Sequence, residues 1–241
     1  MKELYTKKIR IGSSMCDERA RLSVPAAFRI CMDAATEHAQ FLGIGFDYMV
    51  SRNCYWITAK TRIHFNSFPR ILEEVSVCTW PLKPKAASCI RDYRIESADG
   101  KELLCGKTEW VMRDNNSGWL LRGKDIFPED MLFSTETVLE EPFAEPVQPT
   151  DSFRKLGEYT VVSNDIDIGQ HMNNTAYIDA FFRMLSTEEI QKRGYSDVEI
   201  LYRKQCFEGD RITFFELYEP GKTAVAVMNA DGEEVASIRL K

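Results

Sequence analysis

The feature that most constrains this chain is an order of elements that occurs twice. A helix pattern and then four strand-like runs fill residues 23–112, and residues 159–240 repeat that order. Each half ends near the same hairpin turn, ADGKE at Ala98–Glu102 and ADGEE at Ala230–Glu234, where Asp-Gly supplies the positive φ angles of a tight turn. A repeated unit of one helix and about four antiparallel strands predicts an internally duplicated α+β protein.

The first half opens with a clear helix signal. Ser23 suits an N-cap, Pro25 suits the first helical turn, and Gly43 suits the end of the helix. Small and apolar residues recur between them at steps of three and four, so we expect this helix to pack closely against a sheet. The strand-like runs that follow are roughly Cys54–Phe65, Glu74–Pro81, Ala87–Ser97 and Glu102–Met112.

The second half begins after a stretch rich in Pro and Glu that has no periodic pattern. Its expected elements are a strand near Tyr159–Ser163, a helix at about Asn174–Lys192, and strands near Val198–Gln205, Arg211–Leu217, Ala224–Asn229 and Val235–Leu240. We therefore expect a first domain at residues 1–135, a linker at 136–156 that crosses the surface, and a second domain at 157–241.

Composition argues against several classes of function. A net charge of -6 argues against nucleic acid as a partner, because phosphates call for basic patches. The sequence contains no apolar run of about 18 residues, so we expect no membrane span. The N-terminus has no apolar signal core, so we do not expect secretion. The seven cysteines show no CxxC and no metal spacing with the three histidines. We therefore expect free thiols in a reducing cytoplasm, and no metal site.

The chemistry of the chain gathers in SNDIDIGQHMNNTAYIDAFF, Ser163–Phe182. Asp165, Asp167, Gly169 and His171 alternate, so Asp167 and His171 face the same way in an extended segment. The helix that follows presents unpaired amides at its start. A carboxylate, an imidazole and amides in one place suit hydrolysis of a carbonyl compound such as a thioester. An aspartate before a helix is also a common cap or turn former, and that alternative stays open.

This stretch resembles the second-domain motif of the acyl-ACP thioesterases, which hydrolyse fatty acyl-acyl carrier protein. The frame D-x-x-x-H-x-N-N-x-x-Y is present as Asp167, His171, Asn173, Asn174 and Tyr177. The first half resembles the same family in YWITAKTRIHFNSFPRILEEVSVCTWP and ADGKELLCGKTEWVMRD. The resemblance implies a tandem (double) hotdog, in which each antiparallel sheet wraps a long central helix.

The resemblance also implies an activity and a partner. The reaction would release free fatty acid and acyl carrier protein, and so end fatty acid synthesis. The first domain would bind the acyl chain, and the substrate would be linked to its carrier through 4'-phosphopantetheine. No cofactor is implied, and the chain would be a monomer or a homodimer.

Two positions depart from the family pattern. Gly169 stands where the family often has Asn, and Gln205 stands where it often has Glu before a cysteine. A glutamine amide can hold a water or a carbonyl, but it cannot act as a base. We therefore expect Asp167 to orient or activate water, or to attack the thioester directly. His171 would assist it, Gln205 would position water or substrate, and Gly169 and Asn173 would line the site.

Cys206 offers a second mechanism, because a cysteine paired with a histidine can form an acyl-enzyme. It also suits the role of a small buried strand residue, since free cysteines are commonly buried and inert. We favour Asp167 over Cys206.

Three rival functions remain. The first is an acyl-CoA thioesterase of the same fold. The second is a hotdog hydratase, which the spacing of Asp167 and His171 disfavours. The third is a non-catalytic acyl-binding protein that lost turnover through Gly169 and Gln205.

An acidic carrier protein would need a local basic patch on this acidic chain. Each basic residue considered for this patch could equally be an ordinary solvated surface charge. The candidates are Arg203, Lys204, Lys83, Lys85, Arg122 and Lys124.

Overall fold

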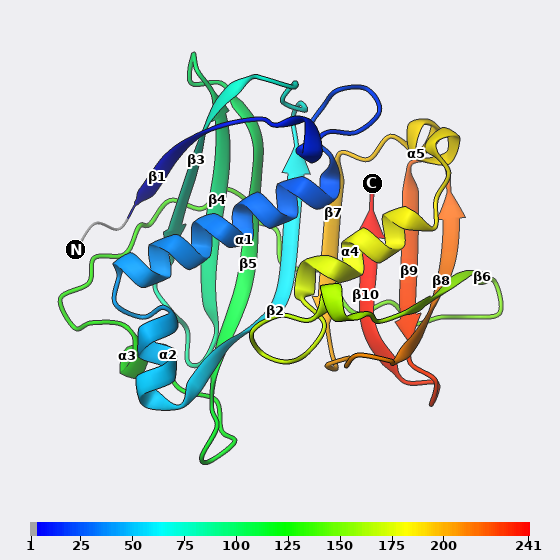
Figure 1. The fold of residues 1–241 in the computed structure, drawn as a ribbon. Coiled ribbons are helices and arrows are strands. Elements are labelled where there is room, and N and C mark those ends of the chain that lie inside the picture. Colours follow the sequence, from blue (N-terminus) through cyan, green and yellow to red (C-terminus); the bar gives the residue numbers. More distant parts are fainter. Residues whose placement is uncertain (1–3) are drawn as a thin grey trace. The chain divides into compact units, whose positions relative to one another are not determined.

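A computed structural model describes residues 4–241, and the chain forms two compact units, residues 1–142 and 143–241. Figure 1 traces both units, each with a helix lying across a sheet. Among the residues 4–241, no helix is long and apolar enough to cross a membrane. We describe each unit separately.

The first unit is one antiparallel sheet with a long helix on one face. Ser23 caps that helix as predicted, because its side chain accepts a hydrogen bond from the Ala26 amide at 3.3 Å. The strands lie in the order β1-β3-β4-β5-β2. The elements are β1 (Tyr5–Arg10), a 3₁₀ turn (Ser13–Met15), α1 (Val24–Phe41), α2 (Phe46–Arg52), β2 (Cys54–Phe65), β3 (Glu74–Pro81), β4 (Cys89–Ser97), β5 (Glu102–Asp114) and α3 (Gly123–Ile126).

The second unit repeats this topology, with its strands in the order β6-β8-β9-β10-β7. Its elements are β6 (Arg154–Thr160), a 3₁₀ turn (Ser163–Asp165), α4 (Asn174–Arg183), α5 (Thr187–Arg193), β7 (Asp197–Tyr202), β8 (Arg211–Glu219), β9 (Lys222–Met228) and β10 (Glu234–Leu240). The α+β fold of two hotdog units is therefore confirmed.

The single helix expected at Asn174–Lys192 is wrong, because the chain breaks it into α4 and α5. Ser186 begins the second helix with a capping box, in which its side chain accepts from the Glu189 amide and the Glu189 carboxylate accepts from the Ser186 amide. The sequence Ser-Thr-Glu-Glu carries that signal.

Each sheet has an apolar face under its helix and a face that the segment between the units crosses in extended form. In the first unit, the Val138 amide donates to the Asp92 carboxylate at 3.0 Å. In the second, the Ala144 amide donates to the Glu199 carboxylate at 2.6 Å. Both carboxylates are buried, so buried acceptors rather than regular secondary structure anchor this segment.

All seven cysteines are free thiols, and six of them are buried. Cys16 is the partly exposed one. The distinction has practical consequences, because exposure decides which thiols reagents can reach.

Candidate active site

The predicted site lies on a tight turn between β6 and α4. The Asp167 amide donates to the His171 carbonyl at 3.1 Å, and the Gln170 amide donates to the Asp167 carbonyl at 3.0 Å. Gln170 has a left-handed φ of 61°, which closes the turn. The Met172 amide donates to the Cys206 carbonyl at 2.7 Å, so the turn is fastened to the chain that follows β7.

The two aspartates of the motif have different positions. The Asp165 carboxylate accepts from the Tyr159 hydroxyl at 2.8 Å and from the Val162 amide at 2.9 Å. It therefore caps the 3₁₀ turn, which is the structural role that an aspartate before a helix commonly has. β6 runs from Arg154 to Thr160, so the strand expected near Tyr159–Ser163 begins earlier, at Arg154, and ends three residues sooner than expected.

Asp167 and His171 come together, both about three-quarters buried. Their closest approach is 3.9 Å, from His171 Nδ1 to Asp167 Oδ1, and Nδ1 also lies 3.3 Å from the Met172 carbonyl oxygen. Asp167 Oδ1 accepts from the Gly169 amide at 2.7 Å. Within residues 4–241, Asp167 Oδ2 has no hydrogen-bond partner. This carboxylate is held by one oxygen and leaves the other available.

Gly169 provides space for this arrangement. A Cβ at this position would lie 2.8 Å from His171 Nε2 and 3.0 Å from Asp167 Oδ1. Such contacts are too close, so a larger residue would require the imidazole or the carboxylate to move. Gly169 has no positive φ. The glycine is therefore needed here for its lack of a side chain rather than for its backbone freedom.

Asn173 is the N-cap of α4. Its side-chain oxygen accepts from the Thr175 amide and the Thr175 hydroxyl, both at 2.8 Å, and its carbonyl accepts from the Ala176 amide at 2.9 Å. The amides of Thr175 and Ala176 are thus already bonded, and they are poor candidates for the expected oxyanion contact.

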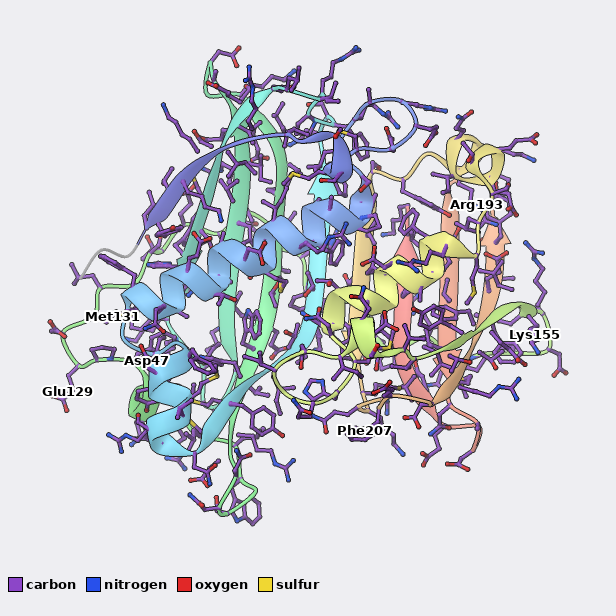
Figure 2. The ribbon with its side chains drawn as sticks, in the orientation of Figure 1. Asp47, Glu129, Met131, Lys155, Arg193 and Phe207 are labelled. Atoms are coloured by element: carbon purple, nitrogen blue, oxygen red, sulfur yellow. The ribbon has the colours of Figure 1, made fainter. Side chains whose placement is uncertain are left out.

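Gln205 and Cys206 differ sharply in exposure. Gln205 is exposed, and its side chain makes no hydrogen bond within the described part of the chain. Cys206 is 1% exposed, and burial raises the pKa of its thiol. No hydrogen bond or ion pair joins the Cys206 thiol to His171 among residues 4–241, so the bonded pair that an acyl-enzyme needs is absent there. Phe207, the next residue, is exposed again (Figure 2).

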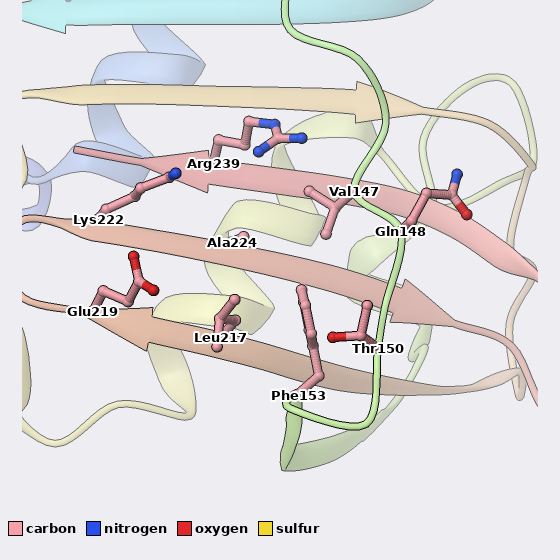
Figure 3. A pocket seen from close by; sticks show the side chains of 9 residues that line it. All are labelled: Val147, Gln148, Thr150, Phe153, Leu217, Glu219, Lys222, Ala224 and Arg239. Carbon is pink, nitrogen blue, oxygen red and sulfur yellow. The ribbon is translucent and has the colours of Figure 1, made fainter.

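A hollow of about 260 Å³ lies elsewhere in the second unit, on the sheet face that the extended segment crosses (Figure 3). It contains none of the predicted site residues. Its lining is Val147, Gln148, Thr150, Phe153, Leu217, Glu219, Lys222, Ala224 and Arg239.

The first unit contains the same turn, which the sequence reasoning missed. The Asp17 amide donates to the Arg21 carbonyl at 2.7 Å, and the Ala20 amide donates to the Asp17 carbonyl at 3.0 Å. Ala20 has a φ of 55°, matching Gln170 in the second unit. The available signal was an aspartate six residues before the N-cap in both halves, Asp17 before Ser23 and Asp167 before Asn173.

Comparisons with known proteins agree across both halves. Profiles described as the acyl-ACP thioesterase N-terminal domain and C-terminal domain match residues 2–125 and 149–241. An acyl-[acyl-carrier-protein] hydrolase of Cuphea viscosissima is 24% identical over 213 residues, which cover 83% of this chain and 51% of that protein. The chain thus spans about half the length of the curated relatives it matches.

Two solved structures share the fold. An acyl-ACP thioesterase from Bacteroides thetaiotaomicron has a TM-score of 0.89 at 21% identity, covering 99% of this chain and 97% of the other. A 12:0-ACP thioesterase from Umbellularia californica has a TM-score of 0.84 at 19% identity, covering 100% and 97%.

Proposed function

The chain belongs to the acyl-ACP thioesterase family, and on that premise we propose that it hydrolyses fatty acyl-acyl carrier protein to free fatty acid and the free carrier thiol. The observation that carries the proposal is the Asp167 carboxylate, held through one oxygen and unbonded at the other among residues 4–241. The reaction would end fatty acid synthesis.

The proposed reaction uses water as the nucleophile. Asp167 Oδ2 takes a proton from water as the water oxygen attacks the thioester carbonyl carbon. The tetrahedral intermediate then collapses, the carbon–sulfur bond breaks, and the leaving thiolate receives the proton. General base catalysis of this kind contributes roughly 10²- to 10⁴-fold.

His171 supports the carboxylate in this scheme. Its Nδ1 faces Asp167 Oδ1 and the Met172 carbonyl, which orients the ring. Nε2 lies over Gly169, where no side chain blocks it. The ring can therefore hydrogen-bond to the water or the substrate carbonyl.

The same proposal gives roles to other residues and segments of the chain. The exposed Gln205 amide would bind water or substrate once substrate is present, and Asn173 would fix the start of α4. Residues 1–135 would bind the acyl chain, with 136–156 as the linker and 157–241 carrying the catalytic motif. Seven free thiols favour a reducing compartment, so we place the protein in the cytoplasm.

The test is release of free fatty acid from a panel of acyl-ACPs and matched acyl-CoAs, followed by mass spectrometry. We expect the wild type to hydrolyse acyl-ACP and Asp167→Asn to lose at least about a hundredfold in rate. Asp17→Asn, at the corresponding turn of the first unit, is the matched control and should keep the wild-type rate.

The rival functions give different outcomes in the same assay. Preference for the CoA thioesters would identify an acyl-CoA thioesterase of the same fold. Acyl binding without hydrolysis of either carrier would contradict the proposal and identify a non-catalytic acyl-binding protein.

A further inference from the structure

The basic residues near the predicted site are neutralised by acidic neighbours. Arg203 pairs with Glu234 at 3.7 Å. Lys204 pairs with Glu233 at 2.5 Å. Since these cations already have acidic partners, they offer little net charge to an acidic protein.

The other four candidates, in the first unit, form a group. The loop 82–88 carries Lys83 and Lys85, and the segment 120–126 carries Arg122 and Lys124. All four side chains are exposed, and within residues 4–241 none of them makes a hydrogen bond or ion pair. We call these four residues the basic patch.

Two contacts hold the two parts of the basic patch together. The Gly123 amide donates to the Ala86 carbonyl at 2.8 Å. A Cβ at Gly123 would lie 2.2 Å from the Pro84 Cβ, so the Gly123 backbone packs against the Pro84 ring where only glycine fits. Gly123 lies between Arg122 and Lys124, and Pro84 lies between the two lysines. This packing places the two basic segments side by side, and the exposed Asp125 is the one carboxylate in residues 82–88 and 120–126.

An exposed aromatic residue adjoins the basic patch. Trp119 is 77% exposed and Leu120 is 48% exposed. Trp119 precedes Arg122 by three residues, so they lie within about 10 Å of each other. Tryptophan and arginine are the residue types most enriched among those that dominate protein–protein binding energy. A basic patch beside an exposed tryptophan therefore fits an acidic protein with some apolar surface.

We propose that the basic patch, with Trp119, is the docking surface for the acidic acyl carrier protein. The inference rests on the proposed function, which supplies a carrier-linked substrate. Charge complementarity identifies the occupant, because residues 82–88 and 120–126 carry four cations and one carboxylate, Asp125, on a chain with a net charge of -6. The carrier presents its thioester on a long prosthetic arm, so the residues that hold its body need not touch the reacting atoms.

The experiment compares two double variants with the same change in net charge. Lys83→Glu/Lys85→Glu reverses half of the basic patch. Lys8→Glu/Lys101→Glu is the control, because Lys8 is on β1 and Lys101 lies beyond the opposite end of β4 from the 82–88 loop, and both are exposed. Each is assayed with acyl-ACP and with the matched acyl-pantetheine, which has no protein carrier, at low and high salt.

We expect the patch variant to lose about tenfold in kcat/KM for acyl-ACP at low salt, with a smaller loss at high salt. Its rate with acyl-pantetheine should equal that of the wild type, and the control should match the wild type with both substrates. Trp119→Ala should lower kcat/KM for acyl-ACP in the same selective way.

Other results would overturn the docking surface. Equal loss with both substrates would mean damage to the site or the fold, and no loss with acyl-ACP would mean that the carrier docks elsewhere. Loss of binding to anionic vesicles with unchanged acyl-ACP turnover would assign the patch to a membrane surface. If the wild type hydrolyses acyl-ACP and the patch variant keeps the full wild-type rate, the docking inference fails alone. If the wild type hydrolyses acyl-pantetheine but not acyl-ACP, the proposed function and the docking inference both fail. If it hydrolyses no thioester, the proposed function fails first and the docking inference with it.

Discussion

The two turns before the central helices have the same backbone and different side-chain chemistry. In the first unit, both carboxylate oxygens of Asp17 accept hydrogen bonds, and the Arg21 guanidinium forms an ion pair with this carboxylate at 2.9 Å. In the second, His171 stands in place of Arg21 at 3.9 Å from Asp167. Gly169 stands in place of Arg19. The difference indicates that main-chain hydrogen bonds build the turn in both units, while the absence of a permanent cation and of a bulky side chain leaves one Asp167 oxygen without a hydrogen-bond partner among residues 4–241.

Replacing the His171 imidazole by a guanidinium, as at Arg21 of the first unit, should cause the largest loss in hydrolysis rate. In His171→Arg, we expect the guanidinium to pair with Asp167 as Arg21 pairs with Asp17, which would weaken the carboxylate as a base. The hydrolysis rate should fall about a hundredfold. Steady-state assays on acyl-ACP measure it, with Arg21→His as the control that should retain the full rate. Retention of more than half of the activity by His171→Arg would show that the two turns do not differ as argued.

Filling the space at Gly169 should have a smaller effect. In Gly169→Ala, the new Cβ meets His171 Nε2 at 2.8 Å unless the ring moves. We expect about a tenfold loss in kcat from the displaced ring, with an unchanged melting temperature because the position is exposed. Arg19→Ala, at the corresponding position of the first unit, should alter neither kcat nor the melting temperature. A wild-type rate in Gly169→Ala would refute the argument from space.

The extended segment between the units offers a second matched pair, the buried acceptors Asp92 and Glu199. Burial raises the pKa of Asp92 to about 6, and Glu136 raises it too. The Val138 amide, Thr137 and Lys107 lower it in part. The folded state keeps this proton up to about pH 6, whereas the unfolded chain loses it near pH 4. The free energy of unfolding should therefore fall as the pH rises from about 4 to 6, and then level off.

Asp92→Asn removes this dependence while keeping an acceptor for the Val138 amide. We compare the free energy of unfolding of the variant with that of the wild type at each pH. We expect this difference, variant minus wild type, to be about 2 kcal/mol larger at pH 7 than at pH 4. Urea unfolding curves at the two pH values measure it. Parallel changes in the two proteins would mean that Asp92 is ionised in the fold at both pH values.

The smallest change in rate is expected at Cys206. The Cys206 carbonyl accepts a hydrogen bond from the Met172 amide, as the Pro69 carbonyl accepts one from the Leu22 amide in the first unit. The backbone therefore holds the turn at both positions, and the Cys206 side chain is not needed for this contact. Cys206→Ala should hydrolyse acyl-ACP within about threefold of the wild-type rate, because a buried thiol with a raised pKa supplies little thiolate. A hundredfold loss, with trapping of an acyl-enzyme in the wild type, would instead favour the cysteine mechanism.

The sequence predicted the elements that carry periodic or capping signals. The bounds of β2 and β3 and the N-cap of α1 agree with expectation, because long alternating runs and a Ser-x-Pro start are strong local signals. The short elements β1 and α2 were not predicted. β1 alternates partly buried and exposed residues over only six positions, but its sequence YTKKIR shows no apolar alternation, and its pairing with β3 supplies what local propensity does not.

For the site, the sequence correctly paired Asp167 with His171, but the extended segment expected there is wrong, because a tight turn closed at Gln170 brings the two side chains together. The separate role of Asp165 was not predictable, because it depends on Tyr159 and on the end of a strand. The space requirement at Gly169 also depends on where the imidazole lies, and a linear pattern does not contain that information.

The distribution of free thiols has a consequence for the laboratory. Six of the seven are buried, and burial raises the pKa of Cys31, Cys89 and Cys105 to about 12, so a maleimide dye at neutral pH should reach chiefly Cys16. Cys16 directly precedes Asp17, the first residue of the turn in the first unit. A fluorophore could thus be attached to the native protein there without first replacing six cysteines, on a different turn from the one that carries Asp167.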